Sequence, residues 1–175
     1  MAISFPAYTR ADTGAGAATS YSINKPTGLV NDDYLMVLFT KGDNAGNATI
    51  TGFTLAIDEQ NGSGDDKSLG LLYKKITNAA GEPGSYTINT GESEESVSQM
   101  VIVRGADLTD FLDVAYSAGS HLTDTQNAAS LTAQPITTAT DGAVVVILAA
   151  TISYADIATV AQVSGYSDFG GNGYD

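Results

Sequence analysis

The sequence predicts an all-β fold, an antiparallel two-sheet β-sandwich that is jelly-roll-like or immunoglobulin-like and forms a single domain. Three observations predict it. Short apolar or alternating segments recur along the chain with Gly, Asn and Asp between them, as in sandwiches and barrels. Thr, Ser, Gly and Ala dominate, whereas the residues that favour exposed helix surfaces are scarce. The length of 175 residues suits one domain with a substantial core.

Several segments in the first half of the sequence have the pattern of strands. Residues 34–39 are apolar without interruption, which is typical of a strand covered on both faces, so we expect them at the centre of a sheet. The other segments are shorter or alternating and are bounded by Gly, Pro, Asn or Asp turns. They are residues 21–23, 49–57, 69–75 and 85–89.

The second half continues the same plan. Residues 97–103 alternate, so the odd-numbered side chains are predicted on one face and the even-numbered ones on the other. Residues 107–115 fit either a helical turn or an irregular segment. Residues 130–138 are Thr-rich and extended, and residues 143–150 form a second uninterrupted apolar run, which predicts another central strand.

The two ends of the chain indicate a sheet edge that needs a partner. We expect residues 1–18 to form a flexible N-terminal arm and residues 19–175 to form the sandwich domain. A weak internal repeat has a second copy that ends one strand short, and a missing strand leaves unpaired backbone groups at an edge. Phe5 and Tyr8 would then anchor the arm to a neighbouring molecule. Alternatively, the arm or a loop folds back and covers its own edge.

The charge of the chain restricts its partners. The formal net charge is −13, from 7 basic and 20 acidic residues. Such a chain repels a phosphate backbone and an anionic membrane surface, so we expect no nucleic acid and no membrane as partner. The N-terminal sequence lacks the basic start and apolar stretch of a signal peptide, so we expect synthesis in the cytoplasm.

The residue types offer little for catalysis. The absence of Cys excludes disulfides, thiolate metal sites and cysteine nucleophiles. The single histidine, His121, lies close to Ser120 and Asp124, but neighbours in a loop do not make a catalytic triad, so we interpret it as a solvated loop residue. The Gly/Asn/Asp stretches 43–47 and 61–66 offer oxygen ligands for Ca²⁺ without the EF-hand pattern and are interpreted as solvated turns. We therefore expect no enzyme activity, no catalytic residue, no metal and no cofactor.

Arg104 is the most informative charged residue. It ends the predicted strand 97–103 in a very acidic chain, so we expect it to pair with a carboxylate. Asp107 and Asp113 are the nearest candidates in the sequence. This prediction gives Arg104 and Asp107 a structural role.

Short motifs follow one another in a fixed order from about residue 22 to the C-terminus. They are Lys25-Pro26-Thr27-Gly28, Asn31-Asp32-Asp33-Tyr34-Leu35-Met36-Val37, Gly52-Phe53-Thr54-Leu55, Leu72-Tyr73-Lys74-Lys75, Glu82-Pro83-Gly84-Ser85-Tyr86-Thr87 and Val101-Ile102-Val103-Arg104-Gly105-Ala106-Asp107. This order resembles the β-sandwich domains of tailed-bacteriophage virion proteins, which occur in capsid decoration proteins and in tail-tip or fibre proteins. That family usually has Gly-Asp before the first buried strand and Gly-Trp on the next, where this chain has Asp32-Asp33 and Gly52-Phe53.

The resemblance implies a non-enzymatic virion structural protein. We expect a capsid decoration (cement) protein that binds the major capsid protein on the outside of a tailed-phage head, stabilises the head, and self-associates there, with a trimer as one option. The alternative is a tail-tip or tail-fibre module that binds a host-surface glycan. Because such domains are also attached to unrelated proteins, the resemblance bears on fold more than on role.

Overall fold

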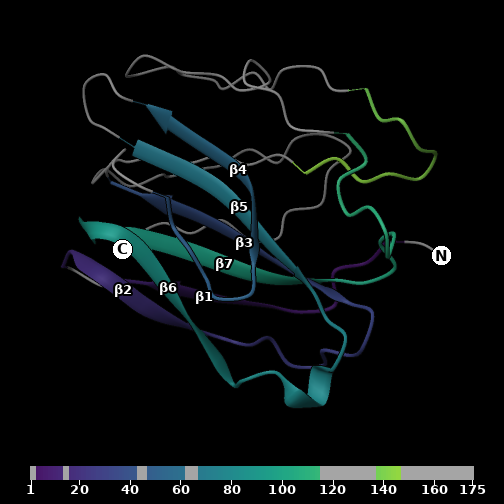
Figure 1. The fold of residues 1–175 in the computed structure, drawn as a ribbon, viewed down its shortest axis with the longest axis horizontal. Helices are drawn as coiled ribbons and strands as arrows, with labels where there is room; N and C mark the ends of the chain where they lie inside the picture. The colour runs from purple at the N-terminus through teal and green to yellow at the C-terminus, as the bar shows by residue number, and fades with distance from the viewer. Residues whose placement is uncertain (1–2, 14–15, 43–46, 62–66, 115–136, 147–175) are drawn as a thin grey trace, which may run out of the picture.

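Strands and one short 3₁₀ turn make up the regular structure of the protein in the computed structural model, which describes residues 3–13, 16–42, 47–61, 67–114 and 137–146. The chain order is visible in the colours of Figure 1. The elements are β1 (Tyr8–Asp12), β2 (Ala18–Asn24), β3 (Tyr34–Lys41), β4 (Thr54–Asn61), β5 (Lys67–Lys75), the 3₁₀ turn η1 (Ala79–Gly81), β6 (Ser85–Glu94) and β7 (Ser96–Val103).

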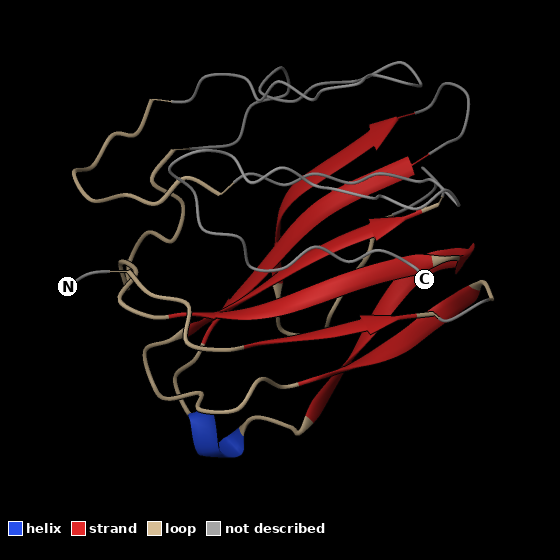
Figure 2. Ribbon diagram, turned by 180° about the vertical axis from the view of Figure 1, so that it is seen from behind, coloured by secondary structure: helices blue, strands red, loops and turns tan. Residues whose placement is uncertain are grey.

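The strands form two antiparallel sheets that pack face to face, which confirms the predicted β-sandwich (Figure 2). The larger sheet has five strands in the order β1-β7-β3-β5-β4, and the smaller one pairs β2 with β6. β3 is the central strand of the larger sheet, with Met36 opposite Tyr73 of β5 on one side and Val101 of β7 on the other. The prediction that residues 34–39 lie at the centre of a sheet is confirmed.

The main core lies between the two sheets. Leu35, Val37 and Phe39 point inward from β3, and Ile23 and Ile88 face them from the smaller sheet. Full burial of each such side chain is worth about 1.5–3 kcal/mol. This core therefore supplies much of the free energy that holds the two sheets together.

The outer face of the five-stranded sheet carries a second apolar cluster. Tyr34 and Met36 of β3 lie on this face beside Val101 and Val103 of β7, and all are buried. Phe111 is one of the partly buried residues packed over them. Both faces of β3 are thus covered, which is the physical reason for its uninterrupted apolar sequence. Met100 and Ile102 of β7 face the main core instead, so the predicted alternation of residues 97–103 is confirmed.

Two predicted strands differ from the structure. The segment 49–57 is not one strand, because Thr49 bridges to Asn89 on the smaller sheet and β4 of the larger sheet begins only at Thr54. The chain turns between them at Gly52, whose φ of +82° favours glycine. Residues 143–146 are not a strand either: they follow a turn, and of them Val146 packs against the apolar cluster on the outer face, whereas residues 147–150 lie outside the described residues.

The N-terminal segment is not the flexible arm that the sequence predicted for residues 1–18. Within it, β1 pairs along its whole length with β7, and Ser4 forms a further bridge to Arg104. Without β1, that edge of β7 would expose unpaired backbone groups, so the ladder stabilises a segment whose own sequence is only weakly apolar. Of the two alternatives, the structure shows the one in which the segment covers an edge of its own sheet.

Candidate functional site

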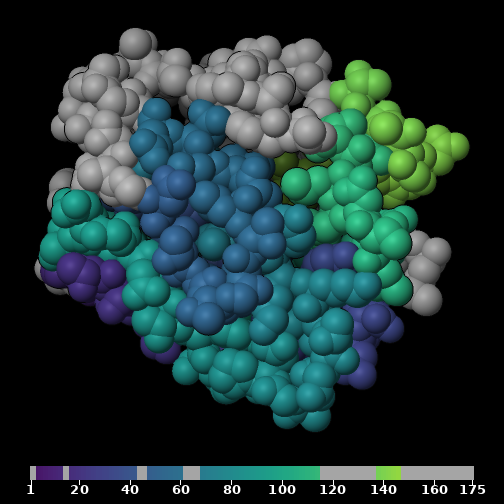
Figure 3. Space-filling model, in the orientation of Figure 1, coloured from purple at the N-terminus to yellow at the C-terminus, as the bar shows by residue number. Residues whose placement is uncertain are grey.

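Three connecting segments meet at one end of the sandwich, which we call the anchored loop end. It comprises residues 25–33 before β3, residues 76–84 between β5 and β6, and residues 104–110 after β7. In Figure 3 the teal atoms of the middle segment form the lower end of the molecule. Side-chain networks fix these segments to the sheets.

The first network is an ion pair between Arg104 and Asp33. Two parallel hydrogen bonds of 2.8 Å join Nε and Nη2 of Arg104 to the two carboxylate oxygens of Asp33, and Nη2 also donates to the carbonyl of Gly28 at 2.8 Å. The Asp33 side chain is 1% exposed and accepts a further bond from the Val30 amide. The hydrogen bonds that Arg104 donates to the Asp33 carboxylate raise the pKa of Arg104. This pair holds the turn before β3 against the end of β7.

The predicted partners of Arg104 are therefore wrong, although Arg104 does pair with a carboxylate, that of Asp33. Asp107 instead closes its own turn by accepting bonds from the amide and hydroxyl of Thr109, at 2.7 and 2.6 Å, and these bonds lower its pKa. Asp113 accepts a bond of 2.6 Å from the Ala139 amide. Asp107 and Asp113 are close to Arg104 in the sequence, but the chain turns away after β7. The end of β7 faces the start of β3, so Arg104 meets Asp33 instead.

A second network is centred on Glu82, which sequence reasoning did not single out. Its carboxylate accepts bonds of 2.6 Å from Lys74 of β5 and from the Tyr86 hydroxyl of β6, and its carbonyl accepts a bond from Lys25 at 2.9 Å. The Lys74 ammonium also lies over the rings of Tyr86 and Phe53, 5.6 and 6.0 Å from their centroids. Each residue belongs to one of the motifs of the resemblance, but nothing in their spacing indicates that they meet.

The Glu82 network predicts an acid-sensitive contribution to stability. Burial alone would raise the pKa of Glu82, but the hydrogen bonds from Lys74 and Tyr86 outweigh it and lower the pKa below its ordinary value. A carboxyl with a lowered folded-state pKa contributes stability at higher pH, and this contribution is lost as the pH falls from the ordinary value through the folded-state value. Glu82→Gln should therefore flatten the fall in melting temperature over that acidic range.

The matched control is Glu92→Gln, at an exposed glutamate on β6. Circular dichroism melts of both variants and the wild type between neutral and acidic pH give the comparison. Equal pH profiles for Glu82→Gln and the wild type would contradict this reading of the network.

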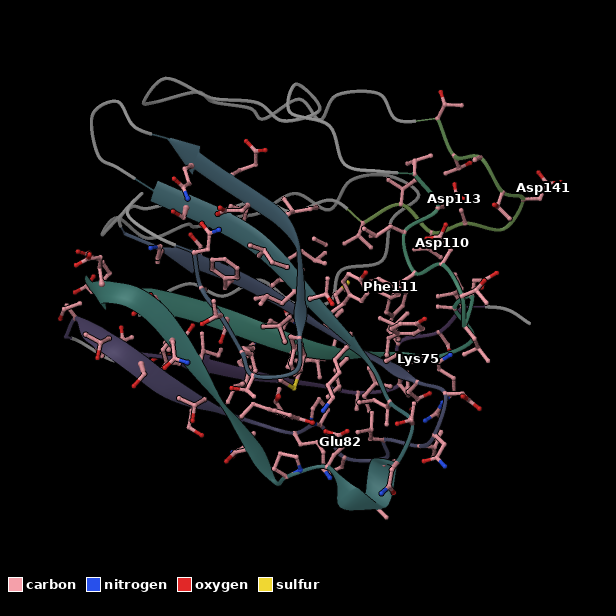
Figure 4. All side chains as sticks on the ribbon, in the orientation of Figure 1. Lys75, Glu82, Asp110, Phe111, Asp113 and Asp141 are labelled. Atoms are coloured by element: carbon pink, nitrogen blue, oxygen red, sulfur yellow. The ribbon has the colours of Figure 1, made fainter. Side chains whose placement is uncertain are left out.

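An aromatic stack fixes the third segment to the outer face of the sheet. The ring of Phe111 stacks on Tyr34 and on Tyr73, with centroids 4.6 and 4.8 Å apart. The Tyr34 hydroxyl donates to the Asp107 carbonyl at 3.0 Å, and the Lys75 ammonium donates to the Leu108 carbonyl at 2.7 Å. Figure 4 shows Lys75 and Phe111 close together on this side of the molecule. Burial and the nearby charge of Asp107 raise the pKa of Tyr34.

The structure does not bring the four predicted site residues into one site. Arg104 and Asp107 belong to the anchored loop end. Phe5 is half-buried and packs on the outer apolar cluster. Tyr8 lies on β1 with its side chain 49% exposed and the Arg10 guanidinium over its ring.

Several residues considered in the sequence analysis lie partly or wholly outside the described residues. His121, Ser120 and Asp124 lie outside the described residues, as do most of the two stretches considered for Ca²⁺. Within the described ranges, no group of three or more His, Asp or Glu side chains is arranged to hold a metal ion. In the same ranges, no helix has the length and apolar character needed to cross a membrane.

Together the fold and this end define a β-sandwich that presents three fixed connecting segments. The bonds of Lys25, Asp33, Glu82, Arg104 and Asp107 there go to groups of the same chain and anchor the segments. Comparison with protein-family models, with curated protein sequences and with solved structures finds no match to this chain.

Replacing Arg104 tests the anchoring directly. Arg104→Lys is expected to lower the melting temperature by several degrees, because a lysine ammonium cannot make the two parallel bonds to Asp33 together with the bond to Gly28. Arg10→Lys is the matched control, since Arg10 is exposed and contacts only the Tyr8 ring. The two variants and the wild type are compared by thermal unfolding, and equal melting temperatures would show that the ion pair does not anchor the turn.

Proposed function

We propose that the chain is a non-enzymatic virion structural protein, a capsid decoration (cement) protein that binds the major capsid protein on the outside of a tailed-phage head and stabilises the head. The ordered motifs that resemble virion β-sandwich domains support this proposal. Their residues are those that tie this sandwich together, among them Asp33, Lys74, Glu82 and Arg104. The resemblance therefore concerns residues that hold the fold together. The proposed role rests on the surface that the fold exposes at the anchored loop end.

The observation that carries the proposal is the anchoring of three connecting segments at one end of the sandwich. A surface that is fixed before binding loses little conformational freedom when a partner docks, which favours tight association. A cement protein needs such a surface, because it must hold neighbouring capsid subunits in one geometry. Val30 and Leu108 are exposed at this end, 48% and 43% respectively, and offer apolar contacts.

The alternative function, binding of a host-surface glycan, finds less support. Sugar rings usually stack on exposed aromatic platforms. In the described part of the chain, Phe111 instead stacks on Tyr34 and on Tyr73, and Tyr8 is the one exposed aromatic residue. No contact at the anchored loop end favours a glycan over a protein partner.

A binding experiment with undecorated heads tests the proposed function. Purified protein is sedimented with heads from the phage that encodes it, and the bound copies per particle are counted by gel densitometry. We expect binding at high copy number and heads that resist heating better when decorated. Failure to bind, or a copy number that fits only the tail tip, would overturn the proposal.

Surface variants locate the contact. Val30→Asp and Leu108→Asp should weaken binding, because each places a charge on an apolar part of the anchored loop end. Val144→Asp is the control, since Val144 is equally exposed, at 43%, but lies outside that end. If the Val144 variant alone lost binding, a different surface would be the one that docks.

A further inference from the structure

The outward face of β1 has an unusual composition for this chain. Tyr8, Arg10 and Asp12 are exposed on it, and they alternate with Thr9 and Ala11, which are half-buried. The Arg10 guanidinium lies 5.2 Å from the centre of the Tyr8 ring. Tyrosine and arginine are both enriched among the residues that contribute most to binding at protein interfaces.

Among the basic side chains that the structure describes, Arg10 is the one with no oxygen partner in the same chain. In the described structure, every other basic side chain bonds to an oxygen atom of the same chain. These are Lys25 to Glu82, Lys41 to Thr90, Lys74 to Glu82, Lys75 to Leu108 and Arg104 to Asp33. Arg10 contacts only the Tyr8 ring, and the side chain of Lys67 lies outside the description.

We propose that Tyr8 and Arg10 form a self-association surface that binds carboxylates of a second copy of this chain. A guanidinium stacked on an aromatic ring keeps its N–H groups directed outward, where they can form two parallel bonds to a carboxylate. The net charge of −13 makes a second copy an acidic surface of the required chemistry. With 20 acidic against 7 basic residues, another molecule of the same protein offers many carboxylates that Arg10 can bind, and we take it as the occupant.

The contact pairs unlike groups of the two copies. Arg10 cannot pair with Arg10 of the other copy, so each Arg10 meets a carboxylate of the other molecule, either reciprocally across a two-fold axis or head-to-tail. This inference goes beyond the proposed function and does not depend on it.

The like charge of the two copies sets the conditions under which the contact forms. At low salt, the net charges repel each other over long distances. At about 0.15 M salt the screening length is about 8 Å, so the long-range repulsion fades while a direct contact between Arg10 and a carboxylate survives. Association is therefore expected to be stronger at that salt concentration than at about 0.01 M.

Sedimentation equilibrium of the isolated protein, over a range of concentrations and at both salt concentrations, is the test. Because no capsid is present, its outcome is separate from that of the head-binding experiment. We expect the wild type to form oligomers, and Arg10→Ser and Tyr8→Ser each to weaken association by roughly tenfold or more. Thr27→Glu is the control, because it changes the net charge by the same one unit as Arg10→Ser at an exposed position in the anchored loop end.

The outcomes are decisive in both directions. Loss of association in the two β1 variants, with Thr27→Glu equal to the wild type and circular dichroism spectra unchanged, supports the proposal. A wild type that stays monomeric at all concentrations overturns it, as does an Arg10→Ser variant that associates as tightly as the wild type. Equal weakening by Thr27→Glu also overturns it, since the effect would then come from net charge alone.

Discussion

Gly70→Ala is expected to destabilise the protein by about 3 kcal/mol or more, at the upper end of what overpacking a core costs. Gly70 of β5 lies opposite Phe39 of β3, and the Phe39 ring covers it. An added Cβ would overlap the ring atoms Cε1 and Cζ and would lie 2.8 Å from the Ile57 carbonyl oxygen. The ring is buried in the main core and the carbonyl belongs to the β4 backbone, so neither neighbour can move without disturbing the sheet.

Chemical denaturation of Gly70→Ala beside Gly84→Ala measures this effect. Gly84 is the matched control, because it is exposed and a Cβ there meets no atom within 4 Å. We expect the control to unfold close to the wild type. The double variant Phe39→Leu/Gly70→Ala should lose less than the sum of the single changes, since the ring clash is removed once. A Gly70→Ala protein as stable as the wild type would contradict the packing between β3 and β5.

Val37→Asp should abolish folding, whereas Leu38→Asp should leave a folded and weakened protein. Val37 is 0% exposed between the two sheets, where a carboxylate would have no cationic partner. The cost of an unpaired buried charge reaches several kcal/mol, comparable with the total stability of about 5–15 kcal/mol of a typical domain. Leu38 is the next residue along β3 and lies half-buried on the outer face, where a carboxylate retains access to water.

Far-UV circular dichroism and thermal melts of the two variants distinguish these outcomes. The pair is matched in strand and in the charge added, so only the face of the sheet differs. If Leu38→Asp were the more damaging change, the assignment of the main core to the space between the sheets would be wrong.

The strands that sequence reasoning located best are those whose pattern is local. The uninterrupted apolar run from Tyr34 to Phe39 predicts a strand that is covered on both faces. The alternation around Met100 predicts which side chains share a face of the sheet, and the structure confirms both predictions. The period of a strand places every second side chain on the same face, so a few adjacent residues are enough to assign it. Residues 143–146 show the limit of this reasoning, since an apolar run alone does not distinguish a strand from an irregular segment packed on one.

The N-terminal segment was mispredicted because its strand character depends on its neighbour. Residues from Tyr8 to Asp12 have few large apolar side chains and, taken alone, indicate a flexible arm. Their backbone pairs with β7, and this ladder exists only once the rest of the sheet has formed. An edge strand is stabilised by the unpaired groups of the strand beside it, which its own sequence does not contain.

The candidate site divides in the same way. The sequence by itself determined that Arg104 needs a carboxylate, because a strand-ending arginine in so acidic a chain needs compensation. Only the tertiary structure decided that the carboxylate is Asp33, 71 positions away in the sequence, and that Lys25, Lys74 and Tyr86 converge on Glu82. The composition and local period of a chain determine which elements form and which side chains need partners. The order in which the strands pair in the sheets determines which of these side chains meet. That order depends on all the strands at once, so no local pattern contains it.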